Sequence, residues 1–136
     1  MKYQYTSYLP DDVSGKFIRR PLVAVEIYGP KETLKDLALI DSGADRTLMN
    51  IEVAKELGID LSRAKKSVVT GVTGQTEVFV MDVEVRPEYL EKVKIPVSFI
   101  DSRFVGVLLG QDGFFDVHKI KFERDHNIFE ITQVKK

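Results

Sequence analysis

The chain has 136 residues, of which 43% are hydrophobic and 30% charged, a composition typical of one compact globular domain. Twenty Lys and Arg against 21 Asp and Glu give a net charge of −1, so charge offers no argument for binding nucleic acid or an anionic membrane. The absence of cysteine excludes disulfides, cysteine nucleophiles and thiolate metal sites. His118 and His126 make a poor zinc site, and we expect neither a metal nor another cofactor.

Residues 1–21 contain no apolar signal-peptide core but do contain a turn-rich stretch at 9–15, Leu-Pro-Asp-Asp-Val-Ser-Gly. Three tyrosines alternate with other residues between positions 3 and 8, so we predict an N-terminal arm or strand that adds to a sheet or to a partner. Residues 22–136 are assigned to one main domain. Because no run of residues is long and apolar enough to span a bilayer, we expect a soluble cytoplasmic protein with no membrane partner.

Short strands separated by turn signals dominate the main domain. The runs at 22–28 and 37–40 predict the first two strands. Pro96 indicates an edge position or a bulge for the strand that contains it. After the first two strands, apolar residues alternate with other residues at 79–85 and at 93–99. A continuous apolar run follows at 105–109, and a hairpin is predicted at 120–131.

Helix is scarce in this pattern. Residues 51–57 are the best candidate, with Asn50 as N-cap and Gly58 in the position of a C-terminal cap. A second short helical turn is expected within 112–117. Many short strands and one or two short helices predict an all-β domain, closed or sandwiched.

The strongest functional signal is Asp41, which follows a buried apolar run and stands inside a Ser-Gly turn. A carboxylate leaves water only where hydrogen bonds or a proton-sharing group compensate it. Gly43 permits a tight turn and offers an unhindered N–H, while Ser42 offers a hydroxyl. An Asp at a strand end is usually an Asx turn that satisfies backbone N–H groups, so the tripeptide alone is compatible with a structural role.

The wider sequence resembles the retroviral-type aspartic proteases, the retropepsins. Residues 41–48, Asp-Ser-Gly-Ala-Asp-Arg-Thr-Leu, are similar to their active-site loop, usually Asp-Thr/Ser-Gly-Ala-Asp-x-Thr after apolar residues. Residues 105–112, Val-Gly-Val-Leu-Leu-Gly-Gln-Asp, resemble the segment that threads behind this loop, and residues 69–78 stand where the family has its flap. The resemblance covers residues 22–131, and the part from 113 onward is more like the prokaryotic relatives than the viral enzymes.

The resemblance implies an all-β, closed acid-protease-type barrel with one or two short helices, which functions as a symmetric homodimer. Aspartic proteases use two carboxylates that share a proton, and this chain has one Asp-Ser-Gly, so a two-fold axis must bring Asp41 from two protomers together. The implied function is an aspartic endopeptidase that hydrolyses a peptide or protein substrate. One alternative is a dimeric peptide-binding or scaffolding module without efficient proteolysis, and another is an unrelated barrel in which Asp41 is a turn carboxylate.

The family also suggests roles for the neighbours of Asp41. Ser42 would form a hydrogen bond across the two-fold axis, and Gly110 would let the segment behind the loop approach closely. Arg46 stands at a position that is often acidic in the viral enzymes. In those enzymes both chain termini interleave in the dimer. For this chain the sequence does not predict which segments form the interface. The expected substrate-binding residues are Gly43, Ala44, Asp45 and Arg46.

A Gly-x-x-Gly stretch between two β-rich runs is ordinarily a hairpin tip. By resemblance it is a flap whose glycines permit motion and whose closure excludes water from the two carboxylates. The flap residues are Gly71, Val72, Thr73 and Gly74.

Some of the remaining candidates are assigned structural roles. Asp60 is predicted to be a turn or capping carboxylate. Phe114 and Phe115 are expected in the core, and both histidines in surface turns of the final hairpin.

Overall fold

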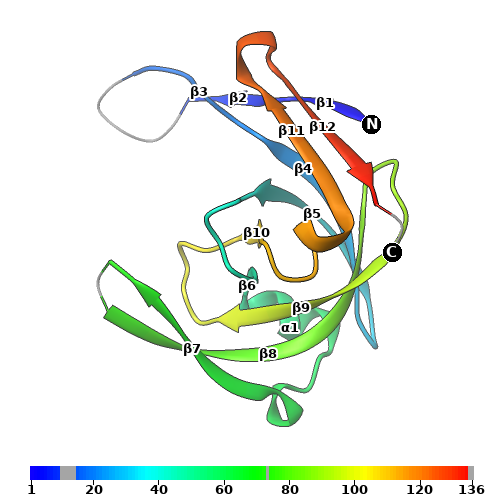
Figure 1. The fold of residues 1–136 in the computed structure, drawn as a ribbon. Coiled ribbons are helices and arrows are strands. Elements are labelled where there is room, and N and C mark those ends of the chain that lie inside the picture. The colour runs from blue at the N-terminus through cyan, green and yellow to red at the C-terminus, as the bar shows by residue number, and fades with distance from the viewer. Residues whose placement is uncertain (10–14, 73, 135–136) are drawn as a thin grey trace.

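The structure is a computed structural model that describes residues 1–9, 15–72 and 74–134, and this part of the chain is built of strands with one short α-helix. Seven strands form the main sheet in the order β4-β5-β10-β6-β9-β8-β7, and β4 also pairs with β8 (Figure 1). A sheet in the order β1-β12-β11 and a β2–β3 hairpin complete the described fold. The strands are β1 Lys2–Gln4, β2 Thr6–Tyr8, β3 Ile18–Arg20, β4 Leu22–Tyr28, β5 Thr33–Ile40, β6 Thr47–Asn50, β7 Lys65–Gly71, β8 Gly74–Pro87, β9 Val93–Ile100, β10 Val107–Leu109, β11 His118–Glu123 and β12 Ile128–Gln133.

The α-helix lies where the sequence predicts it. Helix α1 spans Ile51–Leu57; the Asn50 side chain accepts a hydrogen bond from the N–H of Glu52, and Gly58 ends the helix with φ of 77°. Asp60 accepts a hydrogen bond from the N–H of Ser62 and so caps the next turn, as expected. Three 3-10 turns, the second at the predicted helical turn, are η1 Leu61–Arg63, η2 Phe115–Val117 and η3 Arg124–His126.

Alternating side chains build the core, as the period-two pattern predicts. In β4, Val23, Val25 and Ile27 are buried, while the residues between them are half-buried. β-Branched side chains suit such a pleated, one-sided surface. Facing strands add further buried side chains, which include Val83, Val85, Ile95, Val97, Phe99, Val107 and Leu109.

The strand that contains Pro96 is not an edge strand, because β9 lies between β6 and β8. The pairing of β6 with β9 nevertheless begins only at Val97, opposite Thr47. Pro96 therefore has a neighbouring strand on one side only, opposite Asp82 of β8. A residue without an N–H is tolerated at such a locally unpaired position.

The N-terminal residues pack against the C-terminal hairpin. β1 pairs antiparallel with β12, and the Met1 amino group donates to the carbonyl of Ile131 at 2.9 Å. Tyr5 is buried with its ring edge-on to Phe129, and the ring of Tyr3 stacks on the same phenylalanine. β12 therefore has a partner strand at both edges, β1 and β11.

His118 is not in a surface turn, which corrects the prediction for this residue. It begins β11 with its side chain directed inward and is 3% exposed. Its Nδ1 lies 2.8 Å from the carbonyl oxygen of Phe114, a fully buried core residue. Burial lowers the pKa of His118 below its usual value of 6.5. His126 lies in the exposed η3 turn, as expected.

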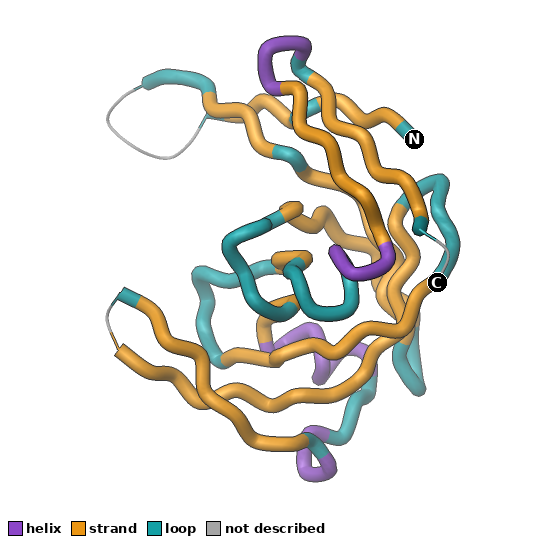
Figure 2. The backbone as a smooth tube through the Cα atoms, in the orientation of Figure 1, coloured by secondary structure: helices purple, strands orange, loops and turns teal. Residues whose placement is uncertain are grey.

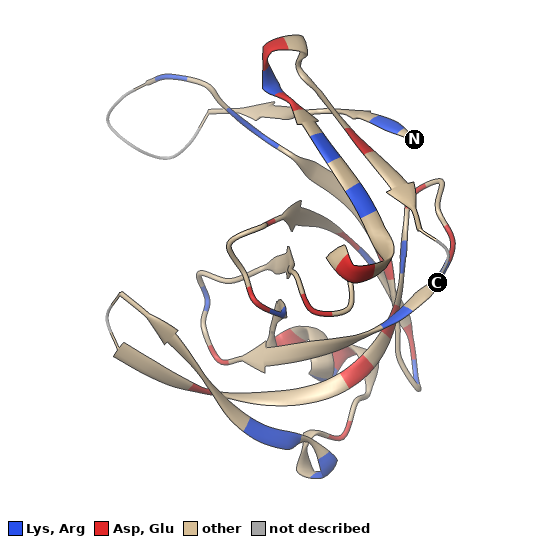
Figure 3. Cartoon of the chain, viewed as in Figure 1, with Lys and Arg blue, Asp and Glu red and all other residues tan. Residues whose placement is uncertain are grey.

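Two hairpins, β2–β3 and β7–β8, project to the same side of the molecule (Figure 1). The loops 41–46 and 101–106 lie between them in this view (Figure 2). Acidic and basic residues are spread over many strands and turns (Figure 3). In the described ranges, no helix has the length and apolar character needed to cross a membrane.

Candidate active site

Asp41 follows β5 directly and is oriented by its own turn. Its N–H donates to the carbonyl of Leu109 at 2.9 Å, and its carbonyl accepts from the N–H of Ala44 at 3.2 Å. The carboxylate oxygen Oδ1 accepts a hydrogen bond of 2.9 Å from the N–H of Gly43, which is the Asx-turn geometry. Within the described part of the chain no hydrogen bond or ion pair engages Oδ2. The turn thus holds one carboxylate oxygen and leaves the other without a partner among these residues.

The segment around Gly110 is inserted between the two strands that flank the Asp41 loop. β10 runs parallel to β5, with Leu109 opposite Ile40, and antiparallel to β6. A Cβ at position 110 would lie 2.6 Å from the carbonyl carbon of Arg46 and 2.7 Å from the oxygen of Ala44. Because both atoms belong to the backbone, only glycine allows this approach.

Two side chains that the sequence analysis did not single out tie the segments together. The hydroxyl oxygen Oγ1 of the fully buried Thr47 accepts a hydrogen bond of 3.2 Å from the N–H of Gly110. The Gln111 amide donates to the carbonyl of Ser42 at 2.8 Å, and the Gln111 N–H donates to the carbonyl of Ala44 at 2.8 Å. Thr47 belongs to the quoted motif, but only the fold shows which group its hydroxyl meets.

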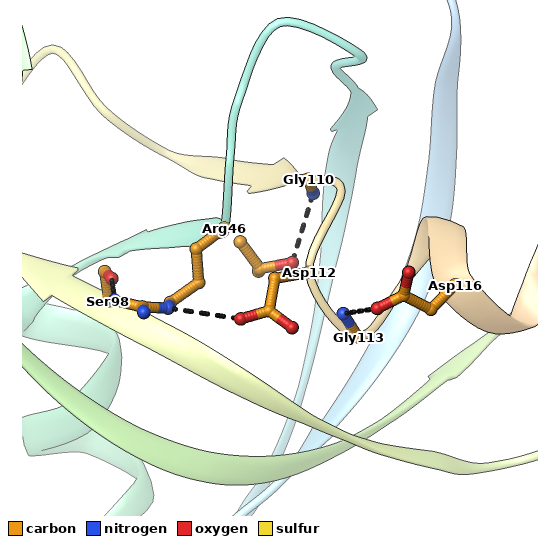
Figure 4. Close-up of polar contacts among 7 residues, drawn as sticks. Arg46, Ser98, Gly110, Asp112, Gly113 and Asp116 are labelled. Carbon is orange, nitrogen blue, oxygen red and sulfur yellow. Dashed lines mark hydrogen bonds and ion pairs between the residues drawn. The ribbon is translucent and has the colours of Figure 1, made fainter.

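Arg46 connects the loop to two other segments (Figure 4). Its Nη1 donates to Oγ of the buried Ser98 at 3.2 Å, and its Nε lies 3.8 Å from Oδ2 of Asp112. The second contact is an ion pair too long for a hydrogen bond, so the buried Nε has no hydrogen-bond partner among the residues that the structure describes. The N–H of Asp112 donates to the carbonyl of Asp45, which adds a backbone link between the same segments.

A cavity of about 470 Å³ lies between the Asp41 loop and β7. The loop contributes residues 43–46, and β7 contributes residues 67–70. All four residues expected to bind substrate therefore share one groove. A larger cavity of about 630 Å³ is lined by residues of β4, β8 and the turn after α1, and it contains none of the predicted site residues.

Four leucines form a row across the strands beside Asp41. Leu39 of β5 stands opposite Leu22 of β4 and, on its other side, opposite Leu108 of β10. Leu108 in turn stands opposite Leu48 of β6, which lines the groove. All four are half-buried and alternate with core residues, so they share the outer face of the sheet. Sequence reasoning missed this leucine row because strand register is not visible in the sequence.

The Gly-x-x-Gly stretch is the tip of the β7–β8 hairpin. Gly71 and Gly74 stand opposite each other, and Gly74 has a φ of 124° that favours glycine. Val72 is fully exposed at the tip. Thr73 lies outside the described residues. The hairpin that carries this tip also supplies one wall of the groove, through residues 67–70.

Within the described ranges, no group of three or more His, Cys, Asp or Glu residues is arranged to hold a metal ion. The site thus consists of one turn-held carboxylate, a segment packed closely behind it, and a groove beneath a β-hairpin. This combination of fold and site can be compared with known proteins.

Comparison with known proteins identifies the family of this chain. A sequence model of the family described as gag-polyprotein putative aspartyl protease matches residues 33–115, a range that contains Asp41, the β7–β8 tip and Gly110. The chain belongs to this retropepsin-like aspartic protease family. Among solved structures it is similar to a retropepsin-like aspartic protease from Rickettsia conorii, with a TM-score of 0.54, 15% identity, and coverage of 96% of this chain and 99% of that one. No curated protein matches the sequence.

Proposed function

We propose that this chain is an aspartic endopeptidase that works as a symmetric homodimer. The observation that carries the proposal is the Asp41 carboxylate, held through Oδ1 by the N–H of Gly43 while none of the described residues engages Oδ2. One such carboxylate cannot both activate water and donate a proton to the substrate, so the site is complete only with a second copy. In the resulting pair the two close carboxylates share one proton.

The chemistry requires no group beyond this pair and a water molecule. The ionised Asp41 accepts a proton from water as the water oxygen bonds to the carbonyl carbon of the peptide. The protonated Asp41 of the partner subunit donates its proton to the carbonyl oxygen, which yields a neutral tetrahedral diol. Asp41, now protonated, then donates its proton to the amide nitrogen while the ionised Asp41 of the partner subunit accepts a proton from a diol hydroxyl. The C–N bond breaks, and an amine and a carboxylic acid are released.

We also propose that each protomer is a closed barrel. The pairings run from β4 through β5, β10, β6, β9 and β8 and then return to β4, so they form a continuous ring. In this ring, β5, which ends directly before Asp41, and β10, which ends directly before Gly110, each have a partner strand on both sides. Such a scaffold holds the catalytic loop rigidly, as two carboxylates meeting at an axis require.

The substrate of the proposed enzyme is an extended peptide in the groove between the Asp41 loop and β7. Gly43 and Asp45 would contact its backbone, and Leu48, the member of the leucine row that lines the groove, would receive an apolar side chain. The β7–β8 tip, with the exposed Val72, would close over the peptide as a flap. Closure excludes water other than the attacking one and strengthens each polar contact inside.

The test is cleavage of a peptide library by the full chain and by Asp41→Asn at mildly acidic and neutral pH. We expect the variant to lose turnover while its dimer mass and circular dichroism stay unchanged. Cleavage by Asp41→Asn at the wild-type rate would overturn the proposal.

Binding of a statine-type transition-state mimic tests the alternative of a binding module. A working carboxylate pair binds such a mimic far more tightly than a matched plain peptide. Equal affinity for the two ligands, together with no turnover, would instead favour the binding module.

A further inference from the structure

The strands formed by the two chain ends are already paired within one protomer. β12 lies between β1 and β11, and the Met1 amino group donates to Ile131. A strand with a partner at both edges has no free row of N–H and C=O groups to offer to a second chain. β12 therefore cannot pair with the terminal strands of a second chain, as the termini of the viral relatives do.

The β2–β3 hairpin ends beside the loop that carries Asp41. Pro21, which directly follows β3, accepts a hydrogen bond of 3.0 Å from the N–H of Ile40, the residue before Asp41. From Pro21 the chain leads outward along β3 to Phe17, a reach of roughly 13 Å at about 3.3 Å per residue. The β2–β3 hairpin projects to the same side of the molecule as the loop 41–46 (Figure 1).

The base of this hairpin is braced by its own protomer. Nη1 of Arg19 donates to Oδ1 of Asn127 at 3.1 Å, and Nη1 of Arg124 donates to the carbonyl of Arg19 at 3.2 Å. Just before β2, the buried Tyr5 packs against Phe129. These contacts orient the hairpin and leave Leu9 and Phe17 exposed.

Two large apolar side chains are exposed near the outer ends of the described parts of the hairpin. Leu9, after β2, is 54% exposed, and Phe17, before β3, is 70% exposed. On the same side, the loop 101–106 carries Phe104, which is 86% exposed (Figure 2). The side of the molecule that carries the loop 41–46 thus exposes large apolar side chains from two segments, and such side chains are candidates for contact with a partner.

We propose that this surface is covered by a second copy of the chain and that the β2–β3 hairpin is a dimer contact in place of interleaved termini. The inference rests on the proposed function, because that function requires a two-fold axis between two Asp41 side chains. Such an axis would pass beside Asp41, and Pro21, which directly follows the hairpin, is hydrogen-bonded to Ile40, the residue before Asp41. In an isologous interface a hairpin that projects from this point lies against the partner subunit, and so does its symmetry mate.

Sedimentation equilibrium of the full-length chain and of Phe17→Asp tests the inference. The matched control is Tyr89→Asp, because Tyr89 is also an exposed aromatic residue (68%) and lies in the β8–β9 turn on the opposite side of the molecule (Figure 1). We expect the dimer dissociation constant to rise about tenfold or more in Phe17→Asp and to change less than about twofold in the control. Peptide cleavage by Phe17→Asp should fall at low protein concentration and recover at high concentration.

A second readout does not depend on an introduced charge. Because the chain has no cysteine, Phe17→Cys and Tyr89→Cys each provide one thiol. The thiol at position 17 should react with a maleimide more slowly in concentrated protein than in dilute protein, whereas the thiol at position 89 should react equally in both.

The outcomes separate the two proposals. A wild-type dimer that Phe17→Asp leaves intact, with a fully reactive thiol at position 17, would overturn the hairpin contact and leave the proposed protease standing. A wild-type chain that is monomeric at every concentration would contradict both.

Discussion

The buried hydroxyl of Thr47 accepts a hydrogen bond from the N–H of Gly110, 63 positions further along the chain. The bond joins the strand after the Asp41 loop to the segment that passes behind it. Neither group has access to water, so the bond cannot be replaced by solvent when it is lost.

Replacing Thr47 by valine keeps the shape of the side chain and removes the acceptor. We expect a loss of about 1–3 kcal/mol in the free energy of unfolding, because the Gly110 N–H is left buried and unpaired. Urea unfolding of the full chain measures this loss in the free energy of unfolding. Thr47→Ser retains the hydroxyl and should recover the hydrogen bond, so a serine variant as unstable as the valine variant would contradict this reason.

Gly110→Ala forces a Cβ to within 2.6 Å of the Arg46 backbone. Because backbone atoms on both sides must move, we expect a loss of about 1–3 kcal/mol or more, together with loss of peptide cleavage. Gly106→Ala is the matched control, since a Cβ there meets nothing within 4 Å. Thermal unfolding of both variants provides the comparison, and equal stability of the two would contradict the packing argument.

His118 should make stability depend on pH. Burial holds its folded-state pKa below 6.5, so the unfolded chain binds a proton that the folded chain does not. The free energy of unfolding therefore falls as pH drops through 6.5 toward the folded-state pKa, and the residue contributes no slope well above 6.5. His118→Gln should flatten this part of the profile measured by urea unfolding.

The control for this prediction is His126→Gln, since His126 lies in an exposed turn. This variant should retain the wild-type slope between neutral and mildly acidic pH. If His118→Gln leaves the pH profile unchanged, the buried imidazole is not the source of the pH dependence of the free energy of unfolding.

Val72 should act on substrate binding and not on folding. Its side chain is fully exposed at the hairpin tip, so Val72→Ser is expected to change the free energy of unfolding by no more than about 0.5 kcal/mol. If the tip closes on the peptide, the same variant raises KM for peptide cleavage. An unchanged KM and kcat would argue against a flap role for this residue.

Local chemistry was sufficient for several parts of this protein. Asn50 and Gly58 mark the ends of α1 because caps act on groups within a few residues. The turn at Asp41 was equally visible, since Gly43 stands two residues from the carboxylate that its N–H contacts. The alternation in β8 and β9 also follows from neighbouring residues, because successive strand side chains face opposite sides.

Contacts between distant residues could not be inferred in this way. The leucine row depends on the register of four strands, the bond from Gln111 to Ser42 spans 69 positions, and the burial of His118 depends on which face of β11 meets Phe114. Sequence alone therefore determined the carboxylate, its turn, the helix and the inward faces of the strands, since these depend on local interactions. Only the tertiary structure decided what surrounds that carboxylate, because strand pairing is settled by the packing of the whole chain.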